Sequence, residues 1–400
     1  MQPREIVNLL GVGRARDRSP LARLLTLDDF RRGARRRLPR PVFDYVEGGS
    51  DREITVRNNE RAFRRRTWVP RALQDVEHVD LTSHFGGGRW GAPFGFSPTG
   101  YTRMISPLGE KAVASAAAAA GIPYVLSTVA TTTIEGIAAL GVPPWYQLYV
   151  MRDRDMTADL VGRAAAAGST VLEVAVDTAV SGNRIRDRRN GLTIPPKMTL
   201  STIADIGLKP AYWTAMLRNE ALDFDQVRAS DKAGVFSGGS IADITSQFDP
   251  SVGWDDIREL RELWPHTLVL KGMFSASDAA TAREAGVDGL HLSNHGGRQL
   301  DQAIAPIDLV ADARRELGPD GLLVVDSGVR SGSDVAIAVA LGADAAFVGR
   351  PYLWGLSVGG EQGVRRVAKI LEAELRRTIA LLGITSVAEL RAEGPRLLRS

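Results

Sequence analysis

The chain has 400 residues, no cysteine, five histidines and a net charge of +3 at pH 7. The lack of cysteine excludes disulfides, zinc ribbons, iron–sulfur clusters, covalently attached haem and a thiol nucleophile. No signal peptide or membrane span is expected. The N-terminal apolar stretch is too short, and the apolar window 112–130 contains Gly, Pro, Ser and Thr. We therefore expect a cytoplasmic protein. There are only six lysines, so a lysine in an apolar strand is a candidate for function.

Residues 1–90 precede any repeating pattern and are predicted to form a helical cap of the same domain as 91–400. Thr26 and the acidic residues after it predict a capped helix that extends to Leu38. The segment 39–53 predicts a loop and a second helix. The arginine-rich runs are interpreted as solvated helix faces, because a nucleic-acid surface would interleave aromatic residues with the arginines. We expect no nucleic-acid partner.

Eight short apolar runs follow, each ending in a polar or glycine-rich corner. Such runs are typical of strands buried on both faces of a parallel sheet. Stretches with helical character separate them, so the sequence predicts a (β/α)₈ TIM barrel. A doubly wound sheet is the alternative, but it would usually carry a glycine fingerprint after its first strand. The predicted strands are 94–97, 124–127, 145–150, 171–176, 268–270, 290–292, 322–325 and 345–348.

Helices are predicted between these strands and in a helical C-terminal tail. A long insertion, about 178–255, follows the fourth strand, at the end of the barrel where such enzymes keep their active sites. Insertions at this place are usually lids or docking loops. The predicted helices are 109–120, 134–140, 158–167, 255–264, 276–286, 306–317, 333–341, 363–382 and 387–393.

The motif SNHGGRQLD, residues 293–301, follows the sixth strand and is the most informative segment. At this position His295 faces the mouth of the barrel, and Arg298 offers a bidentate cation for a carboxylate. A base beside such a cation is what proton abstraction from a 2-hydroxy acid needs. The alternative is a helix-capping turn with an incidental histidine. We expect no metal, because His291 and His295 lie four apart at a strand end, where their side chains diverge.

Lys271 ends the fifth strand, where it either pairs with a core carboxylate or holds an anion or an electron-rich ring. Asp177 ends the fourth strand, as an ion-pair partner or as the carboxylate that orients a catalytic histidine. Glycine-rich corners follow strands seven and eight, at 326–332 and 342–351. Many barrels bind phosphate there through free backbone N–H groups.

Taken together, SNHGGRQLD, the YQLYV strand, the Lys-Gly after strand five, DSGVRSG and GRP resemble the FMN-dependent L-2-hydroxy acid dehydrogenase/oxidase family. The resemblance extends from about Thr26 to Leu382 and is strongest to the bacterial L-lactate dehydrogenase branch, through RIRDRRNGLTIPP and GGEQGV. It implies FMN as cofactor and oxidation of a lactate- or mandelate-like acid to the 2-oxo acid. It further implies that the electron acceptor is a quinone, oxygen or a carrier protein.

The resemblance also implies roles for individual residues. His295 would be the base, Asp177 would orient it, and Lys271 would lie near flavin N1 and O2. Substrate contacts would come from Tyr45, Tyr149, Arg184 and Arg298. Contacts to FMN would come from Pro98, Thr99, Gly100, Ser127, Gln147, Lys271, Ser293, Asp326, Gly328, Arg330, Gly349 and Arg350.

Four residues depart from the family pattern: Ala175, Ala179, Ser327 and Val129. The last would open the substrate pocket and argues against glycolate. These departures keep open an alternative, an FMN-dependent biosynthetic oxidase, monooxygenase or isomerase that acts on a larger substrate. The resemblance suggests a homo-oligomer, a tetramer or larger, and peripheral membrane docking at the inner face is compatible with it.

Overall fold

The computed structural model describes residues 20–191, 207–219, 223–231, 234, 241–272 and 274–399. The start of the expected N-terminal cap, 1–19, lies outside the described residues, as do several stretches of the expected insertion, the longest being 192–206.

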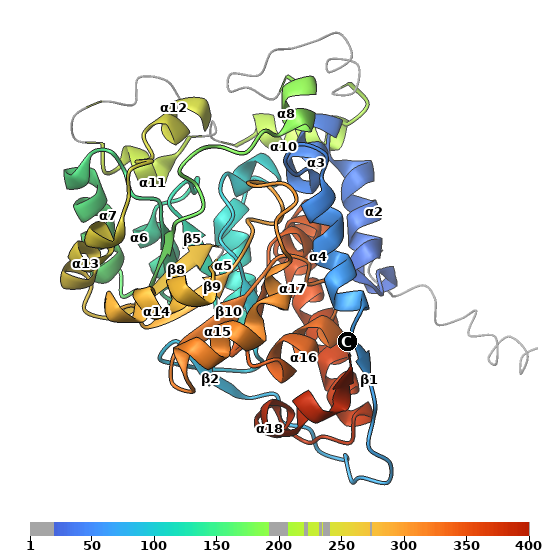
Figure 1. Cartoon of the computed structure of the whole chain (residues 1–400). Coiled ribbons are helices and arrows are strands. Elements are labelled where there is room, and N and C mark those ends of the chain that lie inside the picture. The colour runs from blue at the N-terminus through green and yellow to red at the C-terminus, as the bar shows by residue number, and fades with distance from the viewer. Residues whose placement is uncertain are drawn as a thin grey trace, which may run out of the picture.

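Eight parallel strands form a barrel at the centre of the molecule (Figure 1). The strand order is β4-β11-β10-β9-β8-β7-β6-β5, and a parallel bridge between Phe96 and Tyr124 joins β4 to β5. Each strand overlaps one predicted run, so the predicted barrel is confirmed. The strands are β4 (Phe94–Phe96), β5 (Val125–Ser127), β6 (Trp145–Leu148), β7 (Val171–Ala175), β8 (Thr267–Gly272), β9 (Gly289–Leu292), β10 (Leu322–Val325) and β11 (Ala345–Val348).

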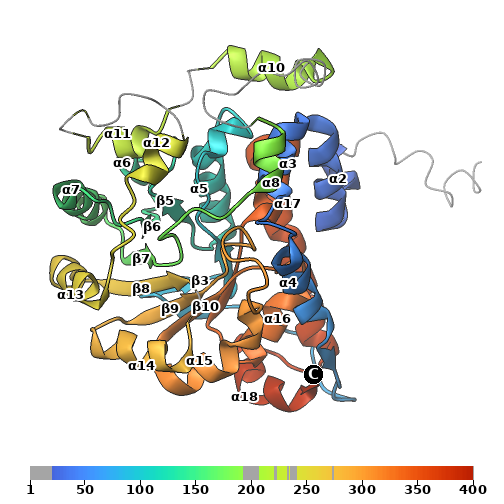
Figure 2. The ribbon, with the colours of Figure 1, turned by 45° about the horizontal axis from the view of Figure 1, so that its top comes forward.

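Helices surround the barrel, so the strands have no face toward water (Figure 2). All five residues of β7 are buried, for example, which is why the runs show no alternation in sequence. These helices are α5 (Gly109–Ala120), α6 (Ile134–Ala138), α7 (Arg154–Ala166), α13 (Trp254–Leu263), α14 (Ala276–Glu284), α15 (Val310–Leu317) and α16 (Gly332–Ala340).

A hairpin of β2 (Ser83–Phe85) and β3 (Gly88–Trp90) covers the amino-terminal end of the barrel. Its Phe85 packs edge-on against Trp145 and Phe347, which lie inside the barrel. The aromatic cluster closes this end, so polar chemistry is confined to the opposite mouth.

The C-terminal tail differs from the prediction. Helix α17 (Arg350–Leu381) begins directly after β11, whereas the sequence predicted a helix from residue 363. The helix is kinked at Gly359 and Gly360, whose backbone angles are not helical. The first part of α17 was not predicted because two adjacent glycines interrupt the helical pattern of the sequence. Pro351 does not prevent the early start, because it lies in the first turn, where proline is tolerated. The early start matters because it places the helix N-terminus at the barrel mouth. Helix α18 (Val387–Leu397) follows, and β12 (Leu398–Arg399) pairs with β1 (Thr67–Trp68).

Three helices of the N-terminal region lie along one side of the barrel: α2 (Leu27–Arg37), α3 (Arg40–Glu47) and α4 (Ile54–Arg64). The predicted cap of α2 is present as a capping box between Thr26 and Asp29. Helix α2 packs against α17, and α3 ends at the barrel mouth. Described parts of the insertion add α8 (Ile185–Arg189), α10 (Pro210–Leu217), α11 (Asp225–Arg228) and α12 (Ile241–Ser246) above that mouth (Figure 2). Within the described chain, no helix is long and apolar enough to cross a membrane.

Candidate active site

One pocket at the carboxyl ends of the strands collects the predicted site residues. All but three of them line it: Tyr45, Pro98, Thr99, Gly100, Gln147, Tyr149, Arg184, Lys271, His295, Arg298, Asp326, Gly328, Arg330, Gly349 and Arg350. The other three, Asp177, Ser127 and Ser293, each contact a lining residue from behind. The structure therefore brings the predicted set together.

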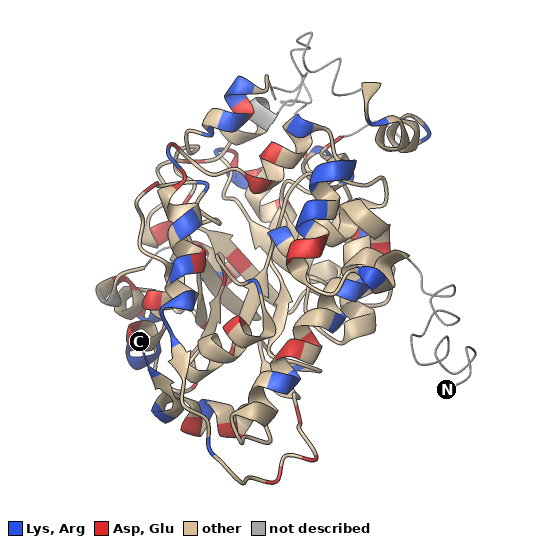
Figure 3. Cartoon of the chain, turned by 90° about the vertical axis from the view of Figure 1, so that its right-hand side faces the viewer, with Lys and Arg blue, Asp and Glu red and all other residues tan. Residues whose placement is uncertain are grey.

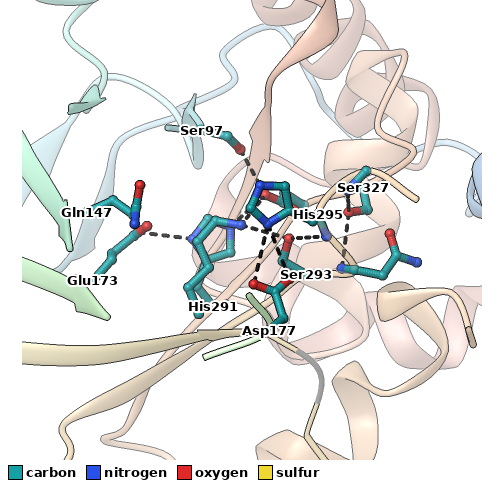
Figure 4. A network of polar contacts seen from close by, with 12 residues as sticks. Ser97, Gln147, Glu173, Asp177, His291, Ser293, His295 and Ser327 are labelled. Carbon is teal, nitrogen blue, oxygen red and sulfur yellow. Dashed lines mark hydrogen bonds and ion pairs between the residues drawn. The ribbon is translucent and has the colours of Figure 1, made fainter. Parts of the chain in front are cut away.

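The loop after β9 holds His295 in a left-handed conformation, with φ of 57°. Ser293 Oγ accepts a hydrogen bond from the His295 backbone N–H at 3.0 Å and fixes the start of this loop. His295 Nδ1 lies 3.3 Å from both carboxylate oxygens of Asp177 (Figure 4). Nε2 of the same ring lies 3.5 Å from the Tyr149 hydroxyl. A carboxylate at Nδ1 favours the tautomer with its proton there, which leaves Nε2 free to accept a proton.

Two arginines border the histidine. Arg298 Nη1 donates to the carbonyls of Tyr45 at 2.5 Å and Gly48 at 3.1 Å, and its guanidinium lies 4.8 Å from the centre of the Tyr45 ring. Arg184 lines the same pocket, and its buried Nε has no hydrogen-bond partner among the described residues. Burial, and then the charge of Arg184, lower the pKa of Arg298. Two like charges facing one cavity favour an anionic ligand such as a carboxylate.

Lys271 resolves one alternative left open by the sequence. Its Nζ lies 3.1 Å from Asp326 Oδ2 and donates to Ser293 Oγ at 2.7 Å, so the ion pair with a core carboxylate exists. Lys271 also lines the pocket, so the pair lies in the wall of the cavity. Burial would lower the pKa of Lys271, but neighbouring carboxylates, Asp326 first, outweigh burial and raise it.

A second cationic group lies at the ends of β10 and β11. Arg350 donates from Nε, Nη1 and Nη2 to the carbonyls of Val46 at 2.8 Å, Gly296 at 2.9 Å and Gly48 at 2.8 Å. This arginine therefore fastens the end of α3 to the barrel mouth and keeps two of its five N–H groups for other acceptors. Burial, and then the charges of Arg330 and Arg298, lower the pKa of Arg350 to about 9. Mutual repulsion of this kind is relieved by a phosphate, and the N-terminus of α17 adds free N–H groups beside it.

The floor of the pocket also fits a flavin. Ser127 Oγ donates to Gln147 Oε1 at 2.9 Å, while the buried Gln147 Nε2 has no partner among the described residues. A donor left unsatisfied in a pocket wall is suited to a heterocyclic acceptor. A side chain at Gly100 would lie 2.3 Å from Val129, so only glycine fits at this part of the wall. The unpaired donor, the buried Lys271 and the arginine cluster are together compatible with FMN.

Apart from Val129, the apolar part of the pocket was not predicted from the sequence. Tyr101 stacks on Phe224 at 4.9 Å, and Tyr149 stacks on Phe248 at 4.3 Å, measured between ring centres. Phe224, Phe248 and Ile244 come from the insertion and line the pocket next to Val129. The insertion was recognised from its length alone, and no spacing within it marks these residues. The buried Glu173 and His291 were also missed as site residues.

Comparison with known proteins is consistent with this geometry. The family model described as FMN-dependent dehydrogenase matches residues 34–397. A provisionally named L-lactate dehydrogenase of Mycobacterium tuberculosis is 44% identical over 374 residues, covering 92% of this chain and 88% of the relative. The (S)-mandelate dehydrogenase of Pseudomonas putida is 37% identical over 368 residues, covering 92% of each chain.

Solved structures agree with the sequence matches. A crystal structure of the monotopic membrane protein (S)-mandelate dehydrogenase has a TM-score of 0.89 and 37% identity, covering 94% of this chain and 99% of that one. These matches favour the predicted hydroxy acid oxidation over the isomerase and monooxygenase alternatives.

Proposed function

The chain belongs to the FMN-dependent dehydrogenase family, and on that premise we propose that it oxidises an L-2-hydroxy acid to the corresponding 2-oxo acid. The observation that carries this proposal is that His295, Arg184 and Arg298 line one pocket while Asp177 contacts His295 Nδ1. FMN, when bound, accepts the hydride that leaves the substrate α-carbon.

His295 takes the hydroxyl proton of the substrate. Its Nε2 faces the pocket while Asp177 holds Nδ1, so the proton arrives at Nε2 and gives an imidazolium beside a carboxylate. Asp177 stabilises this imidazolium and fixes the ring orientation. Tyr149, whose hydroxyl lies 3.5 Å from Nε2, orients the substrate oxygen.

The substrate carboxylate binds between Arg298 and Arg184. Their like charges repel each other across the pocket, and a carboxylate offsets this repulsion. Tyr45 supports the arrangement because its carbonyl and ring both contact Arg298. The carboxylate thus fixes the α-carbon relative to His295.

We propose further that the preferred substrate carries an apolar side chain larger than methyl. The walls of the pocket include Val129, Phe224, Ile244 and Phe248, and two stacked aromatic pairs belong to these walls. Burying an aryl group on such walls stabilises binding by about 2 kcal/mol relative to a methyl group. Selectivity for the larger acid of about 30-fold in kcat/KM follows.

The experiment is anaerobic reduction of the bound flavin by glycolate and by the (S) enantiomers of lactate, 2-hydroxybutyrate and mandelate. For each acid, the rate constant of flavin reduction is divided by the acid concentration that gives half the maximal rate. This ratio should rise from glycolate to mandelate. Phe248→Ala should remove the preference for mandelate and leave the lactate value within about threefold. A flavin that none of these acids bleaches would contradict the proposed reaction, whereas faster bleaching by lactate contradicts only the proposed side-chain preference.

We also propose peripheral docking on an anionic membrane through α10. Leu208, two residues before α10, and Leu217, its last residue, are 77% and 82% exposed. Lys209 lies between them and donates to the Arg36 carbonyl of α2. Figure 3 shows the side of the molecule that carries the basic α2. Apolar residues next to basic ones are typical of an interfacial helix.

Vesicle co-sedimentation tests this docking. The double variant L208S/L217S should lose binding to anionic vesicles, while L73S, at a fully exposed leucine elsewhere, should keep it. Equal binding by all three proteins, or by none, contradicts docking through α10. A homo-oligomer, a tetramer or larger, is proposed on the family resemblance and is checked by light scattering.

A further inference from the structure

Two ionisable side chains lie inside the barrel beneath the residues that face the pocket. Glu173 on β7 and His291 on β9 have fully buried side chains, and Figure 4 shows the two side chains pointing toward each other. The interior of such a barrel is normally filled by apolar residues, and a buried charge without a partner is costly. The burial of Glu173 and His291 inside the barrel therefore calls for a physical explanation.

The contacts connect this pair to the pocket wall. His291 Nδ1 lies 3.0 Å from Glu173 Oε1. On the other side of the ring, Nε2 lies 3.2 Å from Asp326 Oδ2, an ion-pair distance without the alignment of a hydrogen bond. The same Asp326 oxygen lies 3.1 Å from Lys271 Nζ. Strand pairing explains the juxtaposition, because Lys271 and His291 are register partners on β8 and β9.

Charge balance decides the state of the imidazole. The group brings two carboxylates, Glu173 and Asp326, against one ammonium, Lys271, so a neutral His291 would leave one carboxylate without a cation. With His291 protonated, negative and positive charges alternate along the contacts from Glu173 through His291 and Asp326 to Lys271. Burial by itself lowers the pKa of His291 and Lys271 opposes protonation, but Glu173 and Asp326 outweigh both, and the net pKa is raised. The second carboxylate oxygen of Glu173, Oε2, has no hydrogen-bond partner among the described residues. Within that part of the chain, the hydrogen bond from His291 to Oε1 is therefore the only one that the Glu173 carboxylate makes.

We propose that His291 is a protonated positioning residue, held by Glu173, that fixes Asp326 and Lys271 and adds a positive charge beneath the cofactor. The effect on the cofactor rests on the proposed function, since it takes Lys271 to face bound FMN. A cation below the pocket floor favours the reduced, more negative form of FMN. Without His291, Glu173 and Asp326 would place an excess negative charge at the same position.

The first test reads the imidazole directly and needs no catalysis. The holoprotein is labelled on the histidine ring nitrogens, and its NMR spectrum is recorded at about pH 8, where exposed histidines of ordinary pKa are neutral. Replacing the exposed His78, His84 and His266 by glutamine, one at a time, and the partly exposed His295 in the same way, assigns the remaining signal to His291. The proposal predicts an imidazolium signal for His291. A neutral imidazole overturns it.

The second test reads the cofactor equilibrium in charge variants. H291Q should lower the ratio of reduced to oxidised FMN at a fixed solution potential by about tenfold, which is 29.6 mV for a two-electron couple. E173Q removes a negative charge and should not lower the ratio, and H84Q, an exposed control, should leave it unchanged. If H291Q leaves the ratio unchanged, or if E173Q lowers it as much, the proposed charge is wrong. If H291Q does not fold, the NMR test on the unaltered chain decides.

These results separate this inference from the proposed function. Hydroxy acids that fail to bleach the flavin refute the reaction and leave the protonation state of His291 untouched. A neutral His291 in an enzyme that the acids still reduce refutes this inference alone.

Discussion

Replacing Asp177 by asparagine isolates the electrostatic part of the proposed proton transfer. The carboxylate oxygens lie 3.3 Å from His295 Nδ1. Two unit charges at that separation attract by about 5 kcal/mol at an effective dielectric of about 20. The side chains are 24% and 11% exposed, so solvent screens part of this energy. Half of it, about 2.5 kcal/mol, corresponds to about a 70-fold slower step.

Asparagine also presents an amide to Nδ1 and disturbs the tautomer, so the expected loss in the rate constant of flavin reduction is about 10² to 10³. The assay is anaerobic stopped-flow reduction by a saturating hydroxy acid, with FMN content measured from the absorption spectrum. FMN content should not change, because Asp177 does not line the pocket. D320N, at an exposed loop carboxylate, is the control. A D177N rate constant within threefold of that of the unaltered enzyme would contradict the proposal that Asp177 stabilises the protonated His295.

Three further predictions concern the pocket wall. Ser327 has φ of 69°, donates to Asp326 at 2.8 Å and accepts from the Gly296 N–H at 3.0 Å. S327A should therefore lower the free energy of unfolding by about 1–3 kcal/mol. S327G should recover about 1 kcal/mol of that because glycine tolerates positive φ; urea unfolding that ranks alanine above glycine would contradict this. R298K should raise KM for the hydroxy acid about 10- to 100-fold, because lysine cannot replace a bidentate fork; steady-state kinetics with an unchanged KM would oppose the carboxylate role. Burial raises the pKa of Asp326, but Lys271 and His291 outweigh burial and hold it well below the ordinary value. The stabilisation of the folded state by ionised Asp326 is therefore complete above about pH 3.9, the pKa of an aspartate in the unfolded chain. It is lost as the pH falls toward the lower pKa of Asp326 in the folded protein. The stability difference between the unaltered chain and D326N should shrink below about pH 4, and a difference that grows there would contradict the assigned ion pair.

The barrel and most of the pocket were predictable from the sequence. Buried parallel strands leave short runs without alternation, and the residue that ends each run must lie at the same mouth. This is why His295 and Lys271, each predicted from its place at a strand end, line one pocket, and why Asp177, predicted in the same way, contacts His295. The place of each residue at the end of a predicted strand was enough to predict that the three lie together.

Contacts between distant segments were not predictable in the same way. The carbonyls of α3 that bind Arg298 and Arg350 belong to backbone, which no residue type marks. The aromatic walls from the insertion depend on how a long segment folds over the mouth. The pairing of Glu173 with His291 depends on barrel register, because the two side chains meet across the interior from strands that are not neighbours.

The central claim is that His295 removes the substrate proton at an FMN site. The most direct measurement is the visible spectrum of purified H295A during anaerobic mixing with a hydroxy acid that bleaches the unaltered enzyme. We expect H295A to hold oxidised flavin whose absorbance stays constant over many half-lives of the unaltered reaction. Bleaching of H295A at the rate of the unaltered enzyme would contradict it.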